Sequence, residues 1–257
     1  MHKFASKSST LCISQINAND PCRWVTEPAE SLTTENPCSG VSPRTFGDPH
    51  FEQKVFDSVT GESLDICYDV TGSSGQIINV LDDKYSRTKV EGILKDDYYF
   101  HKAIITHQGK RFVVDVDYIT LPEQETYKWE PTTKAVYKSL FFSISRNEVV
   151  IDTSLGIYSI RIIIQKANKS LTGTYLNINF RGLRSDLKRY GGIIGTANRK
   201  NIILLDFVQR NEKTTFKIDN KIVTARLSNR FSHSCYLFNL EDIFTQNELY
   251  NLMYFRN

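Results

Sequence analysis

The chain has 257 residues, of which 40% are hydrophobic and 24% are charged, and this composition is typical of a folded globular protein and excludes wholesale disorder. Its 32 basic and 29 acidic residues give a net charge of only +3, too small for a domain whose surface is built to bind nucleic acid. No apolar stretch approaches the ~20 residues that a membrane-spanning helix needs. The 24 Ile, 15 Val, 15 Phe and 13 Tyr outweigh 8 Ala, and because β-branched and aromatic side chains favour strands, we expect a mostly β protein.

The first 45 residues are rich in Ser, Thr, Pro, Asn and Glu and show little hydrophobic periodicity. They predict an irregular arm or linker, and they contain no apolar run of the kind found in secretory signals. Three of the five cysteines, Cys12, Cys22 and Cys38, lie in this arm. The arm is therefore either held by a disulfide or separated from its normal context, and the odd number leaves at least one thiol free or paired between two molecules.

Residues 46–257 predict one β domain, because short apolar runs alternate with turn signals every 8–15 residues. The expected strands and hairpins cover residues 64–70, 76–81, 103–116, 141–151, 158–165, 174–180, 202–208 and 214–223. Residues 122–134 predict an exposed loop, and residues 240–255 predict the only helix. About ten strands at this spacing favour an all-β, antiparallel sandwich or barrel-like domain with a short C-terminal helix.

The motif Gly47-Asp48-Pro49-His50-Phe51 carries the clearest chemistry in the sequence. An Asp side-chain carboxyl can attack its own main-chain carbonyl to form a five-membered anhydride, with the advantage of an intramolecular reaction. The Pro49 nitrogen leaves readily once it is protonated, and His50 is a candidate for delivering that proton. Water would open the anhydride to complete a simple cleavage, and a sugar hydroxyl would open it to form an ester. The alternative is a proline turn before a strand, with His50 as an ordinary residue.

An ordered series of motifs resembles the C-terminal domain of inter-alpha-trypsin inhibitor heavy chains. The series consists of GDPHF at 47–51, LDICYDV at 64–70, QIINVLDD at 76–83 and KVEGIL at 89–94, followed by GGIIG at 191–195. It extends from about residue 45 to residue 198. The GDPH motif alone is also shared with von Willebrand type D domains.

This resemblance implies that the protein is cut between Asp48 and Pro49 and that the new C-terminal Asp48 is esterified to chondroitin sulfate and passed to hyaluronan. The role of His50 as an acid–base helper comes from the chemistry of the motif. The resemblance also implies an extracellular location, a part in matrix organisation and no cofactor. Turnover as an ordinary enzyme is not expected. Serine protease inhibition belongs to a separate Kunitz-type partner in the family's complex, and nothing in this sequence resembles a Kunitz unit.

The sequence departs from the family in two respects. Only 47 residues precede Asp48, where heavy chains have several hundred, including a von Willebrand type A domain. Tyr190 stands where the family usually has a cysteine, so the family disulfide is not expected; Cys67 and Cys235 remain as a candidate pair, which a Cα separation above ~7 Å would exclude. The competing hypothesis is a non-catalytic, von Willebrand D-like structural or adhesion module with an inert GDPH motif.

Other site patterns are weaker. The five histidines show no metal-ligand spacing, and the GGIIG segment lacks the features of a nucleotide-binding loop, so it predicts a tight strand turn. Asn168 begins the only N-glycosylation sequon. A basic group around the glycines is a candidate for binding sulfates or uronates, against the alternative of an ordinary solvated edge; it comprises Arg181, Arg184, Lys188, Arg189, Arg199 and Lys200.

Overall fold

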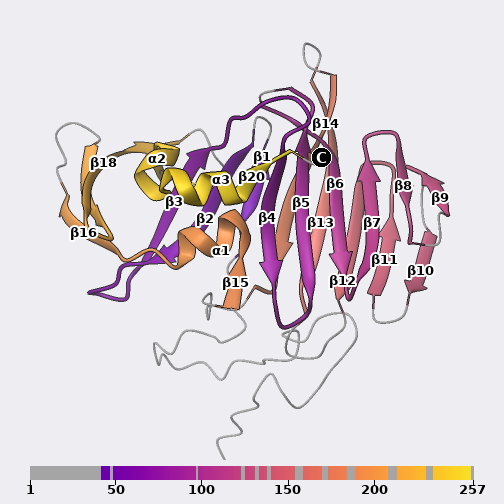
Figure 1. Ribbon diagram of the computed structural model, residues 1–257, viewed down its shortest axis with the longest axis horizontal. Coiled ribbons are helices and arrows are strands. Elements are labelled where there is room, and N and C mark those ends of the chain that lie inside the picture. The colour runs from indigo at the N-terminus through magenta and orange to yellow at the C-terminus, as the bar shows by residue number, and fades with distance from the viewer. Residues whose placement is uncertain are drawn as a thin grey trace, which may run out of the picture.

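The computed structural model describes residues 42–46, 49–96, 98–122, 125–130, 133–137, 140–153, 159–169, 173–183, 189–207, 213–229 and 234–255. These residues form two sheets and three short helices (Figure 1). The predicted all-β class is therefore confirmed. The described residues are divided among twenty strands, more than the ten or so expected, and five of these strands contain only two or three residues. No described helix has the length and apolar character needed to cross a membrane.

The smaller sheet combines the beginning of the β domain with its end. Its strand order is β1-β2-β3-β19-β18-β17-β16. The strands are β1 (Arg44–Phe46), β2 (His50–Phe56), β3 (Ser63–Asp69), β16 (Ile202–Phe207), β17 (Lys213–Ile218), β18 (Lys221–Ser228) and β19 (Cys235–Phe238). β19 runs parallel to β3, an exception to the antiparallel arrangement that the sequence predicted.

The smaller sheet curls toward closure through Asp57, the residue after β2. Asp57 forms an isolated parallel bridge with Ile202 of β16, and the carboxylate accepts a hydrogen bond from the main-chain N–H of Leu204 at 2.7 Å. The other carboxylate oxygen accepts from Val59 and Thr60, each at 2.8 Å. Burial alone would raise the pKa of Asp57, but these N–H donors outweigh it and lower the pKa.

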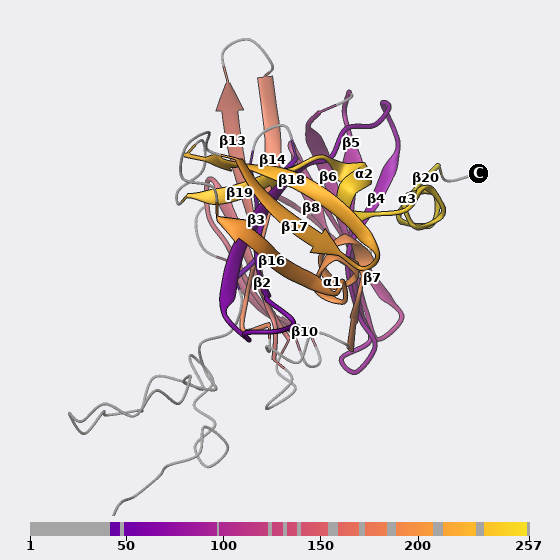
Figure 2. The ribbon, with the colours of Figure 1, turned by 90° about the vertical axis from the view of Figure 1, so that its left-hand side faces the viewer.

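The larger sheet has the main order β10-β11-β12-β13-β14-β6-β5-β4-β15, with β7, β8 and β9 branching from β6 and β20 pairing with β4. In Figure 2 the strands of the smaller sheet lie in front of those of the larger sheet and cross them obliquely. The strands of the larger sheet are β4 (Ile77–Asp83), β5 (Thr88–Leu94), β6 (Phe100–His107), β7 (Lys110–Asp115), β8 (Tyr118–Thr120), β9 (Thr126–Lys128), β10 (Thr133–Tyr137), β11 (Leu140–Ile144), β12 (Glu148–Thr153), β13 (Arg161–Lys169), β14 (Gly173–Arg181), β15 (Tyr190–Gly191) and β20 (Met253–Tyr254).

The buried apolar side chains of the two sheets form one continuous core. The alternation that predicted the strands is the alternation of burial: in β11, Leu140, Phe142 and Ile144 are buried while Phe141 is exposed. Each fully buried Leu, Ile or Phe side chain stabilises the fold by about 1.5–3 kcal/mol relative to an exposed one. The core therefore fixes how the two sheets pack against each other.

Three expectations for individual segments were wrong. The GGIIG segment is not a strand turn: it opens helix α1 (Gly192–Asn198), whose residues 192–197 are buried. The single helix expected at 240–255 is two short helices, α2 (Leu240–Ile243) and α3 (Gln246–Leu252), followed by β20. The break follows from a capping box, in which the Thr245 hydroxyl accepts from the N–H of Glu248 and starts a new helix.

The segment predicted as an exposed loop at 122–134 contains β9 and the start of β10. Trp129 is buried, and its indole N–H donates to the carbonyl oxygen of Asp115 at 2.9 Å. The prolines and glutamates that suggested a loop surround one aromatic anchor. At the N-terminal end, residues 44 and 45, which the sequence assigned to the arm, belong to β1 and hence to the β fold.

Candidate functional site

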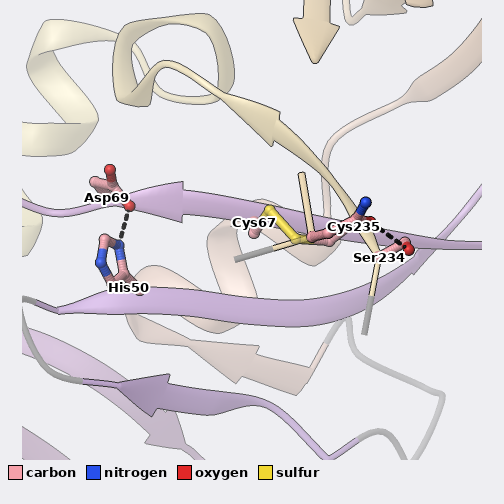
Figure 3. Close-up of a disulfide and its surroundings, with 6 residues drawn as sticks. His50, Cys67, Asp69, Ser234 and Cys235 are labelled. Carbon is pink, nitrogen blue, oxygen red and sulfur yellow. Dashed lines mark hydrogen bonds and ion pairs between the residues drawn. A yellow bond between two sulfur atoms is a disulfide. The ribbon is translucent and has the colours of Figure 1, made fainter. Parts of the chain in front are cut away.

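The site around the GDPHF motif is built on the β2–β3 hairpin. The antiparallel register places His50 at the first position of β2 directly opposite Asp69 at the last position of β3. The imidazole Nδ1 of His50 is hydrogen-bonded to Oδ1 of Asp69, as Figure 3 shows. A carboxylate on Nδ1 holds an imidazole ring in one orientation and stabilises its protonated form. The pair therefore has the arrangement of a proton donor with its orienting group.

The pair is reachable from solvent. The side chain of His50 is 23% exposed and that of Asp69 is 44% exposed. Pro49, next to His50, is by contrast buried, and its carbonyl oxygen accepts a hydrogen bond from the N–H of Val70 at 3.1 Å. The sheet thus fixes the proline side of the Asp48–Pro49 bond. Gly47 and Asp48 lie outside the described residues.

The two strands that carry the pair are locked together by buried side chains. The rings of Phe51 and Tyr68 stack with their centroids 5.5 Å apart. The Tyr68 hydroxyl donates to the Gln53 side-chain oxygen at 2.8 Å, and the Gln53 amide donates to the carbonyl oxygen of Ile194 in α1 at 3.3 Å. Burial raises the pKa of Tyr68 well above its usual value, so this hydroxyl stays protonated and acts as a structural donor. α1 supports the hairpin that positions His50.

A disulfide joins the same hairpin to the C-terminal part of the protein. Cys67, two residues before Asp69 on β3, is bonded to Cys235 of β19, with a Cα–Cα distance of 5.8 Å. That distance lies below the limit that would have excluded the pairing. Both cysteines are fully buried, and Figure 3 shows the bond beside the His50–Asp69 pair. Cys12, Cys22 and Cys38 lie outside the described residues.

The basic group predicted to bind an anionic polysaccharide is not one surface. Arg189 is buried, where it forms an ion pair with Asp83 at 3.2 Å and lies over the rings of Tyr85 and Tyr190. Arg181 is exposed at the end of β14. Arg184 and Lys188 lie outside the described residues.

The two remaining basic residues of that group have partners inside the fold. Arg199 donates to the carbonyl oxygen of Tyr190 and to the Thr196 hydroxyl. Lys200 forms ion pairs with Glu248 at 2.8 Å and Asp219 at 3.3 Å. Both cations therefore tie α1 and the residues after it to neighbouring elements.

Asn168, the first residue of the sequon, is exposed near the end of β13, opposite Thr174 of β14. Its position is accessible to a modifying enzyme, whereas Ser170 lies outside the described residues. Across the parts of the protein that the structure describes, no three His, Cys, Asp or Glu side chains are grouped closely enough to hold a metal ion.

The structure adds one residue to the site that the sequence did not single out. Asp69 becomes the partner of His50 only through the register of the hairpin. Gly61, with a φ of +74°, lies in the turn between the two strands, and pairing outward from Phe56 opposite Ser63 brings residue 50 opposite residue 69. The Thr60-Gly61 turn signal could have revealed this pair.

No protein-family model matches this sequence, and no curated protein matches it.

Proposed function

We propose that this protein cleaves its own Asp48–Pro49 bond and transfers the Asp48 acyl group to a hydroxyl of an extracellular polysaccharide of the chondroitin sulfate or hyaluronan type. In this proposal the β domain acts once on its own polypeptide, in the way of the C-terminal domains of the heavy chains that it resembles. The observation that carries the proposal is the His50–Asp69 pair at the start of β2.

The chemistry uses two steps. An oxygen of the Asp48 side-chain carboxylate attacks the main-chain carbonyl carbon of the same residue, the bond from that carbon to the Pro49 nitrogen breaks, and a five-membered anhydride remains on Asp48. His50, in its protonated form, gives its proton to the departing nitrogen, which becomes a secondary amine. The polysaccharide hydroxyl then attacks the anhydride and loses its proton to the neutral imidazole. An ester and a free carboxylate result.

The surroundings support this division of roles. Asp69 orients the imidazole for both proton transfers. The Val70 N–H holds the Pro49 carbonyl oxygen, so the leaving nitrogen belongs to a residue whose position is fixed by β3. Partial exposure of the pair leaves room for a hydroxyl to enter.

The disulfide supports the extracellular location in the same proposal. A buried disulfide is typical of secreted proteins because the cytosol keeps thiols reduced. An exposed sequon residue at Asn168 is consistent with the same location. Arg181 and Arg199 are the exposed members of the predicted polysaccharide-binding group among the described residues. Because Arg199 is hydrogen-bonded to Tyr190 and Thr196, we assign Arg181, and not Arg189, a contact with the acceptor.

Intact-mass spectrometry of the purified protein, incubated at mildly acidic pH with and without chondroitin sulfate oligosaccharides, tests the proposal. We expect a fragment that begins at Pro49 and, with the oligosaccharide, a second product heavier by one esterified oligosaccharide on the N-terminal fragment. Asp48→Asn should abolish both. Asp69→Asn should slow cleavage by ~10²–10⁴-fold, the usual contribution of a positioned acid–base group.

Asp65→Asn is the matched control, because Asp65 lies on the same strand and face as Asp69 but is opposite Lys54 in the strand register. Its cleavage rate should equal that of the parent protein. An intact parent protein under all these conditions, or an Asp69→Asn variant that is cut at the parent rate, would contradict the proposal. The first result would favour a structural adhesion module with an inert motif.

A further inference from the structure

The short strand β1, immediately before the proposed cleavage site, is bound on two sides. Along one edge it pairs with β2, with Arg44 opposite Glu52 and Phe46 opposite His50. This pairing alone would make it an ordinary edge strand of the smaller sheet. Its other edge does not face solvent, because it lies against β14 of the larger sheet.

The contacts with β14 come from main-chain and side-chain groups together. The N–H of Phe180 donates to the carbonyl oxygen of Pro43 at 3.0 Å. The Thr45 hydroxyl accepts from the N–H of Ile178 at 2.6 Å and donates to the carbonyl oxygen of the same residue at 3.1 Å. Thr45 is 1% exposed, so these hydrogen bonds are shielded from water, and their loss would leave buried polar groups unpaired.

β14 has a place for this strand because its neighbour diverges. β14 pairs with β6 only through Leu176 and Phe100, although it pairs with β13 over nine positions. Beyond Leu176, residues 43–45 take the place of β6 and bond to Ile178 and Phe180. β1 therefore lies between β2 of the smaller sheet and β14 of the larger sheet, in the manner of a peptide added to a sheet edge.

None of these contacts depends on the Asp48–Pro49 bond. We infer that the β domain formed by residues 49–257 is a receptor for its own segment 42–46, and that the cleaved protein is a non-covalent complex of two polypeptides. The inference rests on the proposed function for the cleavage event, whereas the binding itself is a property of the described contacts.

Retention of the cleaved segment would favour transfer of the acyl group to an acceptor hydroxyl over hydrolysis by water. An end group two residues beyond Phe46 is tethered within about 7 Å of it, since two extended residues span no more than that, and Phe46 is opposite His50. A bound segment keeps the acyl group beside the proton-transfer pair until an acceptor hydroxyl arrives. A segment that left at once would carry the acyl group into water, where it would be hydrolysed.

A cut made by an added protease tests the inference without relying on self-cleavage. The full-length protein is given Asp48→Asn, a protease recognition sequence inserted after Gly47, and a fluorescent label at its N-terminus. After cutting, size-exclusion chromatography under native conditions should show the labelled fragment eluting with the β domain. Dilution of the complex, followed by rapid separation, gives the dissociation rate.

Thr45→Val removes the hydroxyl at nearly constant shape and should speed dissociation by ~10- to 100-fold, because it leaves the Ile178 N–H unpaired. Thr45→Ser keeps the hydroxyl and should restore the parent rate. Thr224→Val, at an exposed position of β18, is the matched control and should change nothing. If the Thr45→Val variant fails to fold, the inference is tested by the cut parent protein alone, through co-elution of its labelled fragment with the β domain. A labelled fragment that separates from a folded parent β domain during elution overturns the inference, as does a folded Thr45→Val variant that dissociates at the parent rate.

Discussion

Removing the Cys67–Cys235 disulfide should lower the free energy of unfolding by several kcal/mol. The bond joins residues 168 positions apart in sequence, so it removes many conformations from the unfolded state. For a loop of that length the relation between loop length and entropy gives about 5 kcal/mol at 25 °C. Native disulfides usually contribute about 2–5 kcal/mol, and a whole domain is stable by only about 5–15 kcal/mol. We therefore expect a loss of about 3–5 kcal/mol.

Equilibrium urea unfolding, followed by tryptophan fluorescence, measures this loss. Cys12, Cys22 and Cys38 are replaced by Ser in every protein, so that thiol exchange with the arm cannot occur. The parent is then compared with a variant that also has Cys67→Ala and Cys235→Ala. The same parent, reduced with dithiothreitol, is the matched control, because it loses the cross-link but keeps both side chains in the core.

The two comparisons separate cross-linking from packing. The reduced parent should show most of the expected loss in the free energy of unfolding, and the alanine variant should lose slightly more because two buried side chains become smaller. A loss below about 1 kcal/mol in the reduced parent would refute the argument. It would mean that the unfolded state is already restrained, or that β3 and β19 are held together equally well without the bond.

Three further predictions concern single residues. Asp57→Asn should destabilise the protein by about 2–3 kcal/mol in urea unfolding, since an amide cannot accept hydrogen bonds from all three N–H groups. The fold lowers the pKa of Asp57 below its usual value of 3.8, so the stabilisation by this carboxylate is complete above pH 3.8 and should be lost as pH falls through the folded pKa. The Asp57→Asn variant should not show this pH dependence. Burial lowers the pKa of His107 below its usual 6.5, so on acidification the unfolded state takes up the His107 proton first, and the stability of the parent protein should fall as pH drops below 6.5. In melting temperatures measured against pH, His107→Gln should reduce the slope below pH 6.5. An unchanged slope would exclude His107 as the cause. Gly195→Ala should destabilise the protein by several kcal/mol in urea unfolding, because a Cβ there would overlap the main-chain oxygen of Tyr190. At Gly61 a Cβ would meet open space, but φ is +74°. Gly61→Ala should therefore destabilise the protein by only about 1 kcal/mol in urea unfolding.

The fold class was predictable because most strands bury one face. The alternation in LDICYDV and the glycine turn at residues 108–109 indicated two of the strands within a few residues of their observed positions. The helix at 192–198 could not be predicted in this way. Its glycines are typical of turns, yet they are needed because this segment lies against β4: a Cβ at Gly192 would come within 2.7 Å of the Leu81 main-chain nitrogen.

The site was only half predictable for a related reason. The chemistry of Asp48, Pro49 and His50 is local in sequence and can be written down from residue types. The position of Asp69 opposite His50 depends on strand register, and the position of Thr45 depends on a contact with Ile178, 133 residues away. Likewise Arg189 looked like a surface cation because its neighbours are basic, and only the packing of β15 against β4 shows why it is buried with Asp83.

The pairing of β3 with β19 has a consequence for when the smaller sheet is completed during biosynthesis. A ribosome delivers β1, β2 and β3 early, but the strand that completes their sheet ends at Phe238. Until then Cys67 has no Cys235 to oxidise with, and the hairpin bearing His50 and Asp69 has an unfilled edge. The smaller sheet is therefore completed only after Phe238 has been synthesised, and a nascent polypeptide interrupted before that point would lack the strand that pairs with β3.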